Sequence, residues 1–311
     1  MKNVSNEFIE FEMCELIRKF RYYQGISQHE LYKGLCSKKE YFQLESGDSE
    51  IDELLFEKLL SRLHVQQRLF DVMLDDDQFD RMECRYNINL CMQKKQWEQA
   101  EQLLVEYKNL MPKNNLHQQY MLAKQAEILF QAGMSAGQKF KEALELTLTV
   151  QELEKRLQGS GVISEDELWM YFRYRSSGQE FTEEEYEGFL CTIERHFLVH
   201  QIFPEVYFEA TYEFVLNQYR LQKYAQCREV CGKVLMELKQ GKKTFCLPQV
   251  LLLDAASGMQ LSHDVEQERE LFQQCKQAYY ISLNFCKSEM AQKMLEYCEE
   301  EFGWHIIEQV K

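Results

Sequence analysis

The sequence predicts an all-α protein, and three observations lead to this prediction. Its 311 residues include only 3 prolines and 13 glycines, so few positions interrupt a helix. Leu, Glu, Gln, Lys and Met are abundant, and all are good helix formers. No segment alternates apolar and polar residues strongly enough to predict a strand. We expect a small N-terminal bundle (residues 1–65) followed by a right-handed α-solenoid of paired helices (residues 66–311).

Helix-breaking residues set the expected boundaries of the elements. Residues 1–65 contain about five short predicted helices, and longer amphipathic helices follow. The breaks between the longer helices hold Pro112, residues 159–161 and 176–178, Pro204 and Gly241. The longer helices are expected at residues 78–94, 96–110, 115–132, 137–155, 164–176, 182–199, 204–221, 223–239, 247–261, 264–285 and 288–302.

Composition predicts a cytoplasmic protein that is not bound to a membrane. The chain is 45% hydrophobic and 28% charged, which is enough for folded cores. Its 11 cysteines are an odd number and form no CxxC pair, so free thiols in a reducing compartment are expected. The N-terminus lacks the apolar core of a signal peptide, and no stretch approaches the roughly 20 apolar residues that span a bilayer.

The most specific pattern lies in residues 16–47. Ser27 with Glu30, and Ser37 with Glu40, each have the spacing of a capping box, which predicts two helix starts. Apolar side chains then recur on one face of each helix, so the two helices can pack across a short turn. These side chains are Leu31, Leu35, Tyr41 and Leu44.

This segment resembles the helix-turn-helix domain of the lambda-repressor/Cro (XRE) family, over about residues 10–65. The matching residues are Arg18, Arg21, Gly25, Ser27, Gln28, Leu31, Ser37, Tyr41, Leu44, Glu45 and Gly47. The resemblance implies binding to double-stranded DNA, with the second helix of the motif in the major groove. It also implies that Lys38, Lys39 and Gln43 reach base edges. The resemblance further implies that Gln28 contacts a phosphate and that Arg21 pairs with Glu45 to support the motif. The implied DNA-binding residues are Gln28, Ser37, Lys38, Lys39, Phe42 and Gln43.

Weak internal repeats follow the N-terminal motif. Segment 81–114 matches a tetratricopeptide unit at Trp97, Ala100, Leu104 and Pro112. Segment 208–241 carries Tyr224, Cys227, Cys231 and Val234 at the equivalent spacing, and Phe140 with Ala143 marks a weaker third unit. The first-helix signature of these repeats is absent from all three, so the repeats are degenerate. Stacked helix pairs of this kind form a concave groove.

A helix-turn-helix followed by such repeats resembles the Rgg/PlcR-type peptide-responsive regulators of Gram-positive bacteria. The resemblance implies a homodimeric transcription regulator that binds a DNA operator and a short signalling peptide of the pheromone type used in quorum sensing. Repeat geometry places the expected peptide-binding residues on first helices of the units. They are Arg85, Asn89, Tyr212, Leu216, Tyr219 and Arg220. An arginine can clamp a carboxylate and an asparagine can pair with peptide backbone; alternatively, Arg85 pairs with a carboxylate on an adjacent helix and Tyr212 belongs to the core.

Two other functions stay open from the sequence. The net charge is −15 overall, and residues 1–64 carry 9 Lys and Arg against 12 Asp and Glu. That balance, with Phe42 on the second helix of the motif, also fits a protein-interaction adaptor whose helix-turn-helix no longer binds DNA. An enzyme built on helical repeats is the other alternative. We expect neither enzyme activity nor a metal or cofactor, because no catalytic motif, phosphate loop or metal-ligand spacing is present.

Overall fold

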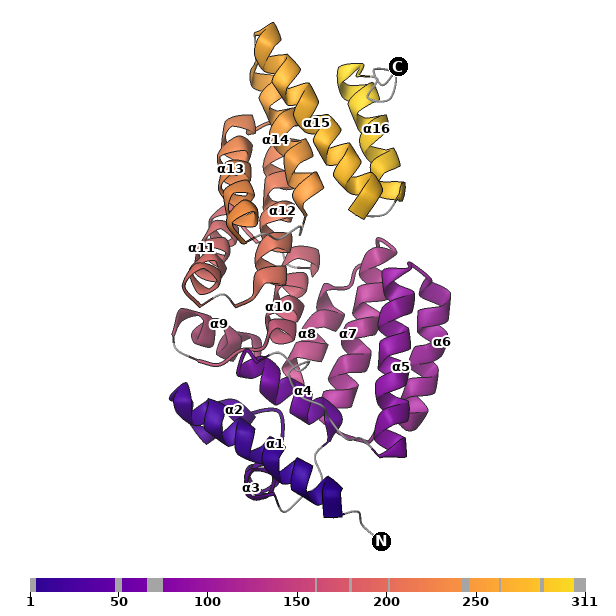
Figure 1. The fold of residues 1–311 in the computed structure, drawn as a ribbon, viewed down its shortest axis with the longest axis vertical. Helices are drawn as coiled ribbons and strands as arrows, with labels where there is room; N and C mark the ends of the chain where they lie inside the picture. The colour runs from indigo at the N-terminus through magenta and orange to yellow at the C-terminus, as the bar shows by residue number, and fades with distance from the viewer. Residues whose placement is uncertain are drawn as a thin grey trace. The chain divides into compact units, whose positions relative to one another are not determined.

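The protein is described from a computed structural model, in which every regular element of the described residues is an α-helix (Figure 1). The described residues are 4–47, 52–65, 75–159, 161–178, 181–200, 202–241, 246–262, 264–285 and 288–304. The predicted all-α class is confirmed. The chain forms two compact units, Met1–Glu185 and Tyr186–Lys311, and each is treated by itself. No helix among the described residues is long and apolar enough to cross a bilayer.

The first unit contains ten helices among its described residues, and an eleventh starts near its end. They are α1 (Val4–Tyr23), α2 (Gln28–Tyr32), α3 (Lys38–Ser46), α4 (Glu53–Arg62), α5 (Asp76–Gln93), α6 (Trp97–Leu110), α7 (Asn115–Gln131), α8 (Gly137–Glu145), α9 (Val150–Gln158) and α10 (Glu165–Gly178). The second unit holds most of α11 (Glu183–His200), then α12 (Pro204–Arg220), α13 (Tyr224–Gly241), α14 (Leu247–Leu261), α15 (Val265–Phe285) and α16 (Ser288–Phe302). The predicted boundary after residue 65 borders residues 66–74, which lie outside the described residues, and it stays a prediction.

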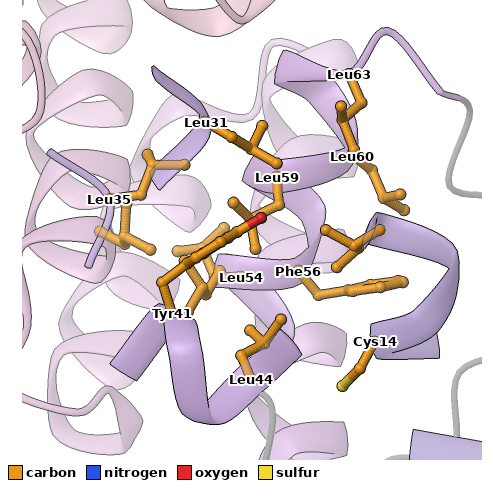
Figure 2. Packing of buried hydrophobic residues seen from close by; sticks show 13 residues of the cluster. Cys14, Leu31, Leu35, Tyr41, Leu44, Leu54, Phe56, Leu59, Leu60 and Leu63 are labelled. Carbon is orange, nitrogen blue, oxygen red and sulfur yellow. The ribbon is translucent and has the colours of Figure 1, made fainter. Parts of the chain in front are cut away.

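Helices α1–α4 pack around one apolar core (Figure 2). Both predicted capping boxes are present, at Ser27 and at Ser37, so local hydrogen bonds fix the starts of α2 and α3. The four predicted apolar side chains of these helices are buried. Leu116 of α7 belongs to the same cluster, so the core of the N-terminal bundle continues into the longer helices.

Helix α1 corrects the expectation of about five short N-terminal helices. Four helices are described before residue 65, and α1 alone has 20 residues. Its sequence contains no glycine or proline, so nothing interrupts it. The helix ends where Gly25 adopts a φ of +69°, a left-handed conformation that suits glycine.

The single helix expected at residues 137–155 is two helices, α8 and α9. The break has a local cause, because the Thr149 side chain accepts a hydrogen bond from the Glu152 amide at 3.3 Å and caps α9. This cap favours the start of a new helix at residue 150 over continuation of α8. The Thr149-x-x-Glu152 spacing was visible in the sequence and predicts this start.

The predicted repeat positions lie in helix–helix cores. Ala100 and Leu104 of α6 are buried in a cluster with α5, and Trp97 is partly buried against it. Phe140 and Ala143 of α8 are also buried. In the second unit, Cys227, Cys231 and Val234 of α13 are buried. The positions chosen for helix packing are therefore in the core, while assignment to tetratricopeptide repeats remains a prediction.

Candidate nucleic-acid interface and ligand positions

Helix α3 has one buried face and one exposed face. Tyr41 and Leu44 point into the bundle core, as Figure 2 shows. The exposed face carries five of the predicted DNA-binding residues, which are Ser37 at the N-cap with Lys38, Lys39, Phe42 and Gln43. The Lys38 ammonium lies 5.5 Å from the centre of the Phe42 ring, within reach of a cation–π interaction. Phe42 thereby supports the lysine instead of only exposing an apolar ring.

Glu45 holds α3 in place from the opposite side. It accepts hydrogen bonds from Arg21 Nε at 2.8 Å and from the Tyr41 hydroxyl at 2.7 Å, so the predicted Arg21–Glu45 pair is confirmed. Burial alone would lower the pKa of Arg21, but the bonds and charge of Glu45 outweigh it and raise that pKa. The Gln28 amide also donates to Glu45. Gln28 retains a second amide proton for the predicted phosphate contact, which stays a prediction.

Most basic side chains of the N-terminal bundle pair with a carboxylate. The pairs are Arg18–Glu15 at 3.5 Å, Lys19–Glu15 at 3.2 Å, Arg21–Glu45 at 2.8 Å, Lys33–Glu152 at 2.6 Å, Arg62–Glu167 at 2.6 Å, and Lys58–Asp166. Among the described residues up to Val65, only Lys38 and Lys39 have no carboxylate partner. Glu15 is shared by Arg18 and Lys19, so that group keeps one uncompensated positive charge, and Lys38 and Lys39 place two more on the exposed face of α3.

The side of the bundle away from this face is held by an ion pair that is buried on both sides. The Arg62 side chain is 0% exposed and that of Glu167 on α10 is 2% exposed. Arg62 donates to Glu167 at 2.6 and 3.3 Å, and to the Leu31 and Lys33 carbonyls at 2.7 and 2.8 Å. One guanidinium therefore ties α2, α4 and α10 together, with all of its contacts inside the first unit.

The turn between α2 and α3 makes a second close contact with the longer helices. Gly34 has a φ of +84°, and a Cβ added there would lie 1.7 Å from the Thr147 carbonyl oxygen. A side chain is excluded both by backbone conformation and by space. Next to this turn, a hollow of about 560 Å³ separates the start of α3 from the start of α7. Ser37 and Gln43 line it, so both face open space.

Arg85, a predicted peptide ligand, is engaged by carboxylates of α4. Its exposed fraction is 4%, and it donates to Glu53 at 2.9 Å and to Glu57 at 2.7 Å. Burial would lower the pKa of Arg85, but Glu57 and Tyr107 outweigh it and raise that pKa. The arrangement is the alternative given by the sequence, a pair with an adjacent helix. A peptide carboxylate would have to replace Glu53 or Glu57 to reach this guanidinium.

Asn89, one helical turn beyond Arg85, has a different environment. Its side-chain oxygen is buried and has no hydrogen-bond partner among the described residues. A buried acceptor without a donor costs free energy, and a backbone N–H of a bound peptide would satisfy it only if neighbouring side chains moved to expose the oxygen. The contact between Asn89 and a peptide stays a prediction.

The four predicted ligand residues of the second unit lie on α12. Tyr212, Leu216 and Tyr219 are half-buried and Arg220 is exposed. Burial raises the pKa of Tyr212. The Tyr219 hydroxyl accepts a hydrogen bond from the Tyr297 hydroxyl of α16 at 2.6 Å. Arg85 and Asn89 belong to the other unit, so each set of predicted ligand residues is described by itself.

Sequence reasoning missed a buried polar network around His117 of α7. One nitrogen of its ring lies 3.1 Å from Asp52, and the other lies 2.5 Å from the Tyr107 hydroxyl. A carboxylate can only accept, so the proton sits on the nitrogen facing Asp52. Asp52, Glu53 and His117 have the atom types and spacing of a metal site. Their acceptors are already used, since Glu53 is bound by Arg81 and Arg85. No sequence spacing pointed to this long-range cluster.

The fold of this chain was compared with those of solved structures. PlcR from Bacillus thuringiensis, solved in complex with the peptide PapR7 and DNA, is matched over 94% of this chain and 100% of its own. The sequence identity is 13% and the TM-score is 0.50. The fold is similar to that of PlcR. The apo form of the competence regulator ComR from Streptococcus vestibularis is matched over 94% of this chain and 99% of its own, at 12% identity and a TM-score of 0.46. Neither a family model nor a curated protein matches the sequence.

Proposed function

We propose that the protein is a sequence-specific DNA-binding transcription regulator whose DNA affinity is controlled by a short signalling peptide. The observation that carries the DNA-binding part is the charge distribution of the N-terminal bundle. Its unpaired lysines, Lys38 and Lys39, both lie on the exposed face of α3, while the other described Lys and Arg side chains of the bundle pair with carboxylates. Unpaired lysines on an exposed helix can contact phosphates and base edges. The similarity of the fold to PlcR, which was solved with peptide and DNA, supports the proposal that this protein binds DNA.

Genome-wide capture of DNA cross-linked to the tagged full-length protein tests this proposal. We compare wild type with Lys38→Ala/Lys39→Ala and with a matched control, Lys108→Ala/Lys113→Ala, which removes the same charge from an exposed part of the first unit. Discrete genomic sites should be present in wild type and control and absent in the α3 variant. On a captured site in vitro, the salt dependence should fall by about 0.9 in slope for each phosphate contact removed. Unchanged binding by the α3 variant would refute DNA reading by α3.

The peptide part of the proposal rests on the buried, unsatisfied oxygen of Asn89 and on the similarity of the fold to PlcR with bound PapR7. Peptides selected from a random seven-residue library on the immobilised full-length protein supply the probe. Asn89→Ala should weaken binding of a selected peptide by about tenfold, as expected for one hydrogen bond in a dry site, without lowering thermal stability. Equal binding by both proteins would remove Asn89 from the site.

An adaptor that does not bind DNA is the second candidate, favoured by the net acidic N-terminal bundle. The DNA-capture experiment separates the two. If wild type enriches no genomic site under several growth conditions, the α3 surface is better explained as a protein-interaction surface. A homodimer is part of the leading proposal, because two copies would present two α3 helices to a two-fold operator.

A further inference from the structure

The second unit contains a cavity that has no part in the proposed DNA or peptide interactions. It has a volume of about 240 Å³ and lies between α11, α12 and α13. Its apolar side chains come from all three helices and are Leu190, Tyr207, Phe214, Val230 and Val234. Tyr207, Phe214 and Val234 are almost fully buried, so the floor of the cavity is part of the packed unit.

Two aromatic contacts join α11 to α12 beside this cavity. Near the start of α11, the ring centres of Tyr186 and Phe214 are 5.5 Å apart, and the Tyr186 hydroxyl donates to the Ala210 carbonyl at 3.0 Å. Near its end, Phe197 stacks on Tyr207 with centres 4.8 Å apart.

The rim of the cavity has an excess of negative charge. Glu187, Glu194 and Glu229 line it, and Lys233 is its single cationic lining residue. Lys233 is neutralised by Glu229 at 2.9 Å. Glu187 accepts a hydrogen bond from the neutral Gln226 amide at 3.0 Å. Glu194 is half-buried and has no hydrogen-bond or ion-pair partner among the described residues. Lys233 also lies close enough to Glu194 for the charge of that carboxylate to raise the lysine's pKa, so one ammonium group serves three carboxylates and the rim keeps an excess of negative charge.

A neighbouring carboxyl supports this description of the local electrostatics. Glu237 of α13 accepts a hydrogen bond from the Tyr207 hydroxyl at 2.7 Å. Burial raises the pKa of Glu237 and the nearby charge of Glu194 raises it further, against the opposing effects of the Tyr207 hydrogen bond and of Lys233. A second cation beside Glu194, in addition to Lys233, would reduce the remaining repulsion.

The cavity lies on a different face of α12 from the predicted peptide positions. Tyr207, Thr211 and Phe214 are four and three residues apart, so they share the face that lines the cavity. Tyr212 and Tyr219 lie on the opposite side of the same helix at that periodicity. Occupation of the cavity and of the predicted groove can therefore be measured separately.

We propose that this cavity binds a small organic cation, a primary amine or guanidinium group carried on an apolar ring or chain. Cavities of roughly 150 Å³ hold one benzene-sized ring, so about 240 Å³ admits a ring with a short chain. It is smaller than the roughly 300–1,000 Å³ of pockets for larger ligands. The apolar body lies against Phe214 and Val230, and the charged group binds Glu194 and Glu187. Both requirements, an apolar body and a positive charge, follow from the lining.

Calorimetry at low salt tests the proposal by measuring how tightly the full-length protein binds 4-phenylbutylamine. The reference compound is 4-phenylbutan-1-ol, which has the same apolar body without the charge. The amine should bind about tenfold more tightly than the alcohol, the difference expected for a charge-assisted contact. Glu194→Gln should remove that difference and leave the binding of the alcohol unchanged. Glu101→Gln, an exposed carboxylate of α6 in the other unit, should change neither.

Cys191 locates the binding, because it lines the cavity and is the one exposed cysteine among those described. Bound amine should slow the labelling of Cys191 by a maleimide severalfold, as quantified by peptide mass spectrometry. Equal affinity for amine and alcohol, an unchanged amine affinity in Glu194→Gln, or unprotected Cys191 would each overturn the proposal. Absence of amine binding at millimolar concentration would overturn it as well. None of these readouts involves DNA or peptide.

Discussion

Replacing Arg62 by methionine should destabilise the first unit by about 3–5 kcal/mol, the usual cost of removing one partner from a buried ion pair. The variant leaves Glu167 without a counter-charge in a site where its side chain is 2% exposed. It also leaves the Leu31 and Lys33 carbonyls without their donor. An upper limit can be given for the part of this cost that comes from the unpaired charge of Glu167. Glu167 can take up a proton, which at pH 7 costs about 1.36 kcal/mol for each unit above its ordinary pKa of 4.5, or about 3.4 kcal/mol.

Urea denaturation of the full-length protein, followed by circular dichroism, measures this loss at pH 7 and pH 5. In Arg62→Met the uncompensated Glu167 has a raised folded-state pKa, so the penalty is present above the unfolded pKa and shrinks as the pH falls. At pH 5 its charge part should be only about 0.7 kcal/mol by the same conversion. Arg62→Met/Glu167→Met should recover most of the stability, because it leaves no buried charge.

Two results would refute this reasoning. A loss below about 1 kcal/mol for Arg62→Met at pH 7 would mean that the pair is not buried as the structure has it. A double variant no more stable than the single one would mean that lost packing, and not an uncompensated charge, explains the effect.

The remaining predictions concern the same unit. Gly34→Ala should lower the free energy of unfolding, measured by urea denaturation, by more than roughly 2 kcal/mol, because the added Cβ would overlap the Thr147 carbonyl. Gly25→Ala, with a φ of +69° and open space around it, should lower it by only about 1 kcal/mol. Equal losses would disprove the close contact at Gly34. Ser37→Ala should lower the free energy of unfolding by about 1 kcal/mol through loss of the capping box, and an unchanged midpoint would show that the cap is dispensable. Arg62 holds the pKa of Glu167 below its ordinary value against the opposing effect of burial, so its stabilisation is present above about pH 4.5 and lost as the pH falls below it. A pH titration of wild-type stability should show this loss and Glu167→Gln should show less of it; parallel curves would contradict the assignment.

Local signals made much of the N-terminal bundle predictable. Ser27 and Ser37 mark the starts of α2 and α3 because a capping box involves residues three apart. Tyr41 and Leu44 could be assigned to the core because helical periodicity places them on one face. The break before α9 was missed although Thr149 carries the same kind of local signal.

The partners of the charged residues could not be predicted in this way. Arg62 and Glu167 are 105 positions apart, and Arg85 meets Glu53 across 32. Sequence position alone made Arg85 a candidate ligand and Lys33 one more available cation, whereas both are bound by carboxylates from other helices. Neither the cavity beside Glu194 nor the network at His117 corresponds to a sequence motif, because each is formed by several helices.

The sequence by itself determined that the chain is helical, where most helices begin and end, and which face of α3 is buried, because these depend on hydrogen bonds and side-chain periodicity within a few residues. Only the tertiary structure decided which basic residues remain unpaired. Ion pairing depends on distances between side chains that the packing of separate helices creates, and a buried charge must find a partner wherever the fold brings one. That selection left Lys38 and Lys39 unpaired on α3, while Arg62 of the next helix became part of the core.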